Sequence, residues 1–177
     1  FVPDIRTLGL ADYSERGKGS TNMKFDLANN TMGAHVSEFP VGTYKKAHRH
    51  GADFHVFSVT GSGYSLLWYE EDEGFERVDW QHGVVFAPPD GMYHQHYNTS
   101  DEPARYLAIA LGSLRYPFTS EKMGLFSGVD VSVKDGGRQI EYEDQDPRIH
   151  GIFLDELKKN DGTSGMTDFI DETPYTK

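Results

Sequence analysis

Short hydrophobic segments with alternating polar positions, separated by turn residues, follow one another through the middle of the chain. The segments lie at 34–41, 54–60, 64–69, 75–80, 83–87, 93–97 and 104–111. Short strands at this spacing are typical of an all-β sandwich or barrel. The acidic residues 70–74 predict a solvated hairpin turn between two of these strands. The pattern therefore predicts an all-β domain.

The segments on either side of this region have a different pattern. The first thirty residues are polar and interrupted by glycine, which predicts an arm that wraps the barrel or adds an edge strand. A further strand is expected at 129–133. We therefore expect an N-terminal arm at 1–30, a β-barrel at 31–135 and a C-terminal extension at 136–177.

One helix is predicted in the C-terminal extension. Asp146 and Pro147 suit the N-cap and the first helical position, and the helix is expected to end near Asn160. Apolar residues line one side of it, so we expect it to pack on the barrel or on a partner subunit. Residues 163–177 are expected to be loosely ordered.

Composition restricts the chemistry available to this chain. Its 177 residues suit one domain with a substantial core. It has no cysteine, which excludes disulfides, thiolate metal sites and a cysteine nucleophile. A formal charge of -11 disfavours nucleic acid and anionic membranes, because both would be repelled. No bilayer-spanning apolar run and no signal pattern occur, so we expect a cytoplasmic protein that binds a small molecule.

Histidines are concentrated in two short segments. His48 and His50 are two residues apart, as are His94 and His96. On an extended strand, residues two apart project from the same face, so each pair can offer two imidazoles to one site. Neutral imidazole suits iron, nickel, copper and zinc. The sequence therefore predicts a divalent metal site.

The residues around these histidines resemble two sequence motifs of the cupins. The first motif begins with Gly, five residues and His-x-His, which Gly42, His48 and His50 match. The second motif, Gly, five residues, Pro-x-Gly, two residues, His, three residues and Asn, is met at every position: Gly83, Pro89, Gly91, His94 and Asn98. The resemblance covers about residues 31–112. It implies a jelly-roll barrel that binds a metal through His48, His50 and His94.

One motif position departs from the cupin pattern. The glutamate ligand that should follow His50 is replaced by Phe54 if the gap is three residues, or by His55 if it is four. An inward His55 would give a site of four histidines. Otherwise the site resembles the three-histidine iron centres of cupin dioxygenases. The two residues cannot both face the metal, and the sequence does not fix the register.

The resemblance implies a metal-dependent enzyme. The leading expectation is an Fe(II) dioxygenase that cleaves a small aromatic or diketone substrate, because residues 80–98 and 102–107 loosely resemble gentisate-type and diketone-cleaving dioxygenases. The alternatives are a non-redox lyase, isomerase or decarboxylase using Zn, Ni or Mn, and a cupin that only binds a small ligand. A homodimer is expected.

Further site residues are expected around the metal. His96 and Tyr93 are assigned catalytic roles, His96 beside the ligands and Tyr93 at the pocket mouth. Arg105 and Arg115 either pair with a substrate carboxylate or form surface salt bridges.

Overall fold

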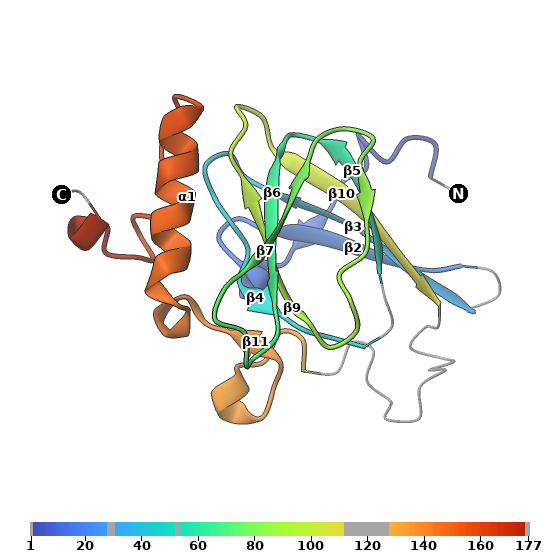
Figure 1. Cartoon of the computed structure of the whole chain (residues 1–177). Coiled ribbons are helices and arrows are strands. Elements are labelled where there is room, and N and C mark those ends of the chain that lie inside the picture. Colours follow the sequence, from blue (N-terminus) through green and yellow to red (C-terminus); the bar gives the residue numbers. More distant parts are fainter. Residues whose placement is uncertain (1, 28–30, 52–53, 112–127, 176–177) are drawn as a thin grey trace.

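Two antiparallel sheets packed face to face form the body of the protein (Figure 1). The computed structural model describes residues 2–27, 31–51, 54–111 and 128–175. The six-stranded sheet has the order β1 (Ala11–Asp12), β2 (Thr21–Leu27), β3 (Met32–Phe39), β10 (Ala104–Leu111), β5 (His55–Thr60) and β8 (Val85–Phe86). The five-stranded sheet has the order β11 (Gln139–Ile140), β4 (Ala47–His48), β9 (Tyr93–Asn98), β6 (Gly63–Trp68) and β7 (Glu76–Trp80). The predicted all-β class is confirmed.

The strands follow the hydrophobic pattern closely. Each of the seven predicted segments contains a strand, although β8 is reduced to two residues. The N-terminal segment supplies β1 and β2, which extend the six-stranded sheet beyond β3. The strand predicted at 129–133 is wrong: Ser132 only bridges Gln139, and a 3-10 turn, η3 (Val133–Asp135), follows. Glycines at 136 and 137 end any extended run there.

The inner faces of the two sheets enclose one hydrophobic cluster. Its buried members come from both sheets and from the turn before β5: Phe39, Phe54, Val56, Trp80, Ala104, Tyr106, Ala108 and Ala110. The outer face of the five-stranded sheet carries a second, aromatic cluster, in which the rings of Tyr64 and Tyr97 stack at 4.5 Å. Alternation along β6 and β9 places every second side chain in the aromatic cluster: Tyr64, Leu66 and Trp68 from β6, and Tyr93 and Tyr97 from β9.

Helix α1 (Pro147–Lys159) covers the outer face of the five-stranded sheet (Figure 1). The Asp146 side chain caps it by accepting a hydrogen bond from the backbone N–H of Arg148, as predicted. Ile149, Phe153 and Leu157 pack into the aromatic cluster, so the helix packs on the sandwich of its own chain.

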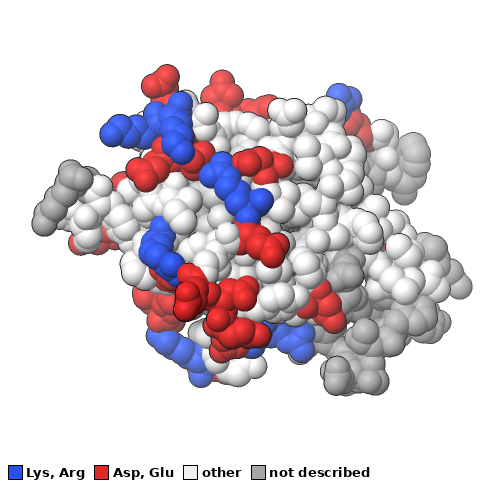
Figure 2. Space-filling model, viewed as in Figure 1, with Lys and Arg blue, Asp and Glu red and all other residues white. Residues whose placement is uncertain are grey.

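Ion pairs surround this contact between helix and sheet. Figure 2 shows acidic and basic side chains interspersed on this face of the molecule. Arg77 of β7 binds Glu156 of α1 at 3.1 Å and Asp79 at 2.7 Å, which links the strand to the helix. Within the described part of the chain, no helix is long and apolar enough to cross a membrane.

The segment after α1 is packed, which corrects the expectation of a loosely ordered tail. Met166 is fully buried in the aromatic cluster. Glu172 lies 3.1 Å from Nε2 of the buried His150, and the Tyr175 hydroxyl donates to the carbonyl of Pro147 at 3.0 Å. The polar composition of this segment does not indicate these contacts, because each one is made by a single residue and leaves no hydrophobic pattern.

Candidate metal centre

His48 and His94 face each other across two paired strands. The antiparallel register of β4 and β9 places the two residues directly opposite each other. Both side chains point inward and are buried, with 9% and 3% of their surface exposed. Their Nε2 atoms lie 3.1 Å apart. Strand pairing alone therefore brings two imidazole nitrogens to one point.

His50 completes a group of three. The ligand nitrogens of His48, His50 and His94 all lie within 4.8 Å of one another. His50 follows β4 in a turn, and its carbonyl accepts a hydrogen bond from the N–H of Gly91 at 3.0 Å. Gly91 has a φ of 73°, a conformation that favours glycine. The Pro-x-Gly turn of the second motif thus fixes the loop that carries His50.

The three rings are held in their neutral form, which is the form that binds a metal. Burial lowers the pKa of His48 and of His94 well below the usual value. Burial also lowers the pKa of His50, to about 4. The Nδ1 of His94 lies 3.1 Å from the carbonyl of Met92, so it carries the proton and leaves Nε2 free. A neutral imidazole with a free nitrogen is a metal ligand at neutral pH.

The spacing of the nitrogens fits a bound divalent ion. Two ligands at about 2.1 Å from a metal are about 3.0 Å apart when they subtend 90°, and about 3.4 Å apart at the tetrahedral angle. The 3.1 Å between His48 and His94 is closer to the first value. The residues therefore fit an ion bound on one face by three histidines.

Phe54 occupies the place of the missing glutamate. Its side chain is buried, 2% exposed, and its ring centroid lies 4.8 Å from that of His50. His55 is the next residue, the first of β5, and alternation turns its side chain to the exposed side. The structure does not bring His55 to the other three histidines, so the fourth ligand considered from the sequence is withdrawn.

His96 and Tyr93 lie on opposite faces of β9. Tyr93 packs in the aromatic cluster under the guanidinium of Arg49 and borders neither cavity near the histidines, so its predicted catalytic role is withdrawn. His96 shares the inner face with His94, at 5.6 Å between ring centroids. The Ser65 hydroxyl accepts from Trp80 Nε1 at 3.0 Å and lies 2.7 Å from Nδ1 of His96.

This hydrogen-bond chain is compatible with a neutral His96 that carries its proton on Nε2. Because Ser65 already accepts from Trp80, its own proton is available for Nδ1 of His96. The neutral ring then keeps its proton on Nε2. Burial lowers the pKa of His96 to about 3, so the ring stays neutral and Nε2 remains a donor.

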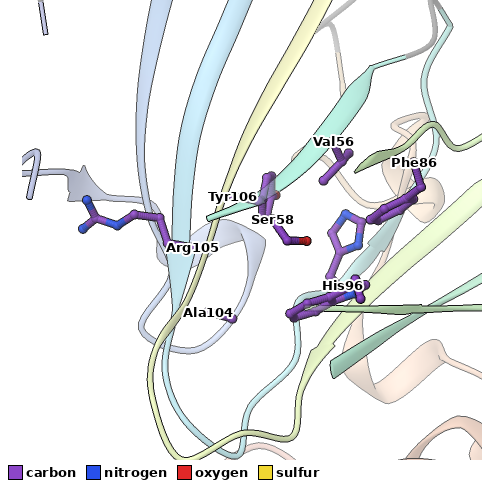
Figure 3. Close-up of a pocket in the computed structure, with 8 residues that line it drawn as sticks. Val56, Ser58, Phe86, His96, Ala104, Arg105 and Tyr106 are labelled. Atoms are coloured by element: carbon purple, nitrogen blue, oxygen red, sulfur yellow. The ribbon is translucent and has the colours of Figure 1, made fainter. Parts of the chain in front are cut away.

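A small cavity of about 10 Å³, the His96 cavity, adjoins this ring. It is enclosed mainly by Val56, Phe86 and Tyr106, and it has the room of about one water molecule. Figure 3 shows the Arg105 guanidinium pointing away from the other residues that line it. Arg105 instead binds Glu38 at 2.7 Å, which is the salt-bridge alternative of the sequence interpretation. Arg115 lies outside the described residues.

Comparisons with known proteins support the architecture. No profile of a known family matches the chain, and no curated protein matches its sequence. Solved structures of Bacillus subtilis oxalate decarboxylase are similar to it. One variant, altered at four consecutive residues, gives a TM-score of 0.52 at 18% identity over 62% of this chain and 29% of its own. A tryptophan-to-tyrosine variant gives 0.51 at 20% identity over 58% and 28%. The chain has the cupin fold.

The similarity extends over a limited part of the larger proteins. The chain spans less than a third of the oxalate decarboxylase chains that it matches. A third structure, of the same enzyme studied for its Mn(II) centres, gives a TM-score of 0.50 at 20% identity over 55% of this chain and 27% of its own. At these identities the comparison establishes the fold, and the histidine group is a feature of this chain's own geometry.

A second cavity, the Arg16 cavity, adjoins the metal centre. His48 and His50 line one part of it, and Arg16, Lys45 and Tyr106 line another. The sequence interpretation did not include Arg16 or Lys45. Lys45 lies between two positions of the first motif and Arg16 lies in the polar arm, where neither residue stands out. Only the folded arrangement shows that the two cations share a cavity with the histidines.

Proposed function

We propose that this cupin is a divalent-metal enzyme that acts on a small molecule by non-redox chemistry, as a decarboxylase, lyase or isomerase. The observation that carries the proposal is the group of three neutral histidines, His48, His50 and His94, with two Nε2 atoms 3.1 Å apart. The Mn(II) centres of the similar oxalate decarboxylase make Mn(II) the first metal to test. The homodimer and the cytoplasmic location stay predictions.

Proton-bearing groups beside the metal centre favour non-redox chemistry over the Fe(II) dioxygenase expected from the sequence. Nε2–H of His96 is a donor on the same face as the ligands. The Tyr106 hydroxyl borders both cavities and accepts a hydrogen bond from Lys45 at 3.1 Å. Proton transfer to or from a substrate carbon requires groups of this kind. The similar structures described above are also those of a decarboxylase.

Each part of the site has a distinct role in this proposal. A bound divalent ion supplies a Lewis acid that polarises a substrate oxygen. Phe54 and Val56 form apolar walls that exclude water, which strengthens electrostatic interactions within the site. Tyr106 holds a proton at its hydroxyl, and the ammonium of Lys45 stabilises the phenolate that forms when this proton leaves. His96 donates from Nε2 to developing negative charge.

Metal content and oxygen consumption test this proposal. The full chain, stripped and dialysed separately against Mn(II), Fe(II), Ni(II) and Zn(II), is expected to bind one ion per chain. The His94→Ala variant should lose it, whereas the exposed His55→Ala variant should keep it. The loaded protein should convert a member of a panel of small carboxylic acids without stoichiometric uptake of oxygen. Stoichiometric oxygen consumption by the Fe(II) form with a catechol or β-diketone would instead establish the dioxygenase.

A further inference from the structure

We infer that the Arg16 cavity binds a carboxylate group of the substrate through Arg16 and Lys45, so the substrate is a small carboxylic acid. The metal end of this arrangement rests on the proposed function. His48 and His50 line the same cavity as the two cations. One small molecule can therefore contact the metal centre and the cations together.

Arg16 is a buried guanidinium with donors that no described residue uses. It is 4% exposed, and its Nη1 donates to the carbonyl of Val129 and to Oε1 of Gln139, both at 2.7 Å. Within the described part of the chain, no acceptor binds Nε or Nη2, and no carboxylate forms an ion pair with Arg16. Asp130 lies near it, but its carboxylate accepts from the Tyr13 hydroxyl at 3.3 Å. The planar Nε and Nη2 donors suit a carboxylate.

Lys45 is a second buried cation, and no carboxylate of the described residues pairs with it. It is 2% exposed, and Nζ donates to Ser37 Oγ at 2.5 Å and to the Tyr106 hydroxyl at 3.1 Å. An ammonium has three donors, so one N–H has no acceptor among the described residues. Burial of a charge without a counter-ion is costly, and an anion bound beside these two cations would offset that cost.

Another polar atom of the cavity also has no partner among the described residues. Nδ1 of His35 is buried and forms no hydrogen bond with the described residues. The His35 ring lines the cavity and lies 5.3 Å from Phe54 and 5.8 Å from Tyr106, between centroids. A ligand in this cavity can therefore form hydrogen bonds on more than one side.

Backbone contacts fix the two cations relative to each other. The N–H of Lys46 donates to the carbonyl of Arg16 at 2.9 Å, which joins the arm to the segment before β4. The arm itself forms a closed loop, because the N–H of Tyr13 donates to the carbonyl of Ser20 at 2.8 Å. The cations are thus held in place before any ligand binds, which lowers the cost of binding.

The volume of the cavity restricts the ligand to a few non-hydrogen atoms. It measures about 40 Å³, a few times the room that one water molecule needs. A carboxylate on the cations leaves space for a second short group that reaches toward His48 and His50. Short dicarboxylic, hydroxy or keto acids have this form. The phosphate group is the other anion that such cations bind, so the experiment includes it.

Calorimetric titration of the full chain tests the inference, in the metal-free and the Mn(II)-loaded states. The ligands are malonate, its uncharged analogue malonamide, and inorganic phosphate. We expect malonate to bind in both states and malonamide to bind in neither. Lys45→Met should weaken malonate binding by about tenfold or more, as for loss of a buried charge partner. Lys158→Met removes the same charge from an exposed position on α1 and should leave the affinity unchanged.

The outcomes separate this inference from the proposed function. If malonamide binds as tightly as malonate, if phosphate binds while malonate does not, or if Lys45→Met keeps the wild-type affinity, the inference is overturned. If Lys45→Met does not fold, the comparison of malonate with malonamide on the wild type still tests the inference. Metal content, measured on the same samples, tests the metal centre by itself. Malonate binding by a protein that takes up no metal would support the carboxylate site and reject the metal enzyme.

Discussion

The carbonyl oxygen of Arg16 accepts a hydrogen bond from the backbone N–H of Lys46, at 2.9 Å. This bond joins the N-terminal arm to the segment that leads into β4 and its metal-centre histidine. The contact needs a close approach of two backbones, and glycine at position 17 permits it. The arm is therefore a structural part of the site.

Replacement of Gly17 by alanine should loosen this contact. Gly17 has a φ of 141°, and a Cβ there would lie 2.7 Å from the Tyr142 hydroxyl and 3.0 Å from Cα of Lys45. We expect Gly17→Ala to reduce the free energy of unfolding by about 1–3 kcal/mol, measured by chemical denaturation. Gly74→Ala is the control, because nothing lies within 4 Å of its Cβ position. Equal stability of the two variants would contradict the contact.

The hydroxyl of Ser65 should control the tautomer of His96. Ser65→Ala removes the partner of both Trp80 Nε1 and His96 Nδ1, and each buried polar group left unpaired costs about 1–3 kcal/mol. We expect a loss of stability and a change in the ¹⁵N chemical shifts of the His96 ring. Ser58→Ala, at a buried serine that lines the same cavity, should leave those shifts in place. Unchanged ring shifts in Ser65→Ala would refute the assigned tautomer.

The metal-free protein should lose stability in mild acid. Histidines of the unfolded chain take up protons near pH 6.5, whereas burial lowers the pKa of His50 to about 4 and that of His96 to about 3 in the folded chain. Between these values the unfolded state binds more protons, so stability falls as the pH falls from about 6.5 toward 3. Each pKa unit of difference corresponds to about 1.4 kcal/mol.

Denaturation of the metal-free protein at a series of pH values measures this effect. His96→Gln should flatten the dependence on pH below about 6.5, because it removes one of the shifted groups. His55→Gln, at an exposed position, should follow the wild type. Parallel curves for all three proteins would show that His96 is not held neutral.

Tyr106 should ionise earlier than the other buried tyrosines. Burial raises its pKa, but the ammonium of Lys45 and the hydrogen bonds from Lys45 and Ser37 outweigh burial and hold it below the usual value of 10. Burial raises the pKa of Tyr13 to about 12. Titration of phenolate absorbance should show an early step that is absent in Tyr106→Phe and moved to higher pH in Lys45→Met. An early step that survives Tyr106→Phe would assign it to another residue.

Strands, helix and most of the metal centre could be predicted from the sequence because they depend on local patterns. Alternation located β5, β6 and β9, and the Asp146–Pro147 pair located the start of α1. The second cupin motif identified His94 by its fixed spacing from a Pro-x-Gly turn. These signals lie within a few residues of what they predict.

Other features depend on contacts between distant segments and could not be predicted in this way. The side of β5 that faces inward, and with it the position of His55, was set by strand pairing with β10 and β8. Arg16 and Lys45 are 29 positions apart, and no sequence pattern indicates that both border one cavity. The burial of Met166 likewise depends on the aromatic surface around α1.

The closed loop of residues 13–20 separates the choice of substrate from the chemistry of the metal. It carries Arg16 but none of the histidine ligands, and its two ends meet at the hydrogen bond between Tyr13 and Ser20. The side chain at position 16 can change while the bond to Lys46 is kept, because that bond uses only the backbone carbonyl of residue 16. Natural divergence or directed evolution can therefore retune which acid this protein accepts through a short N-terminal segment, outside the region that sequence motifs recognise.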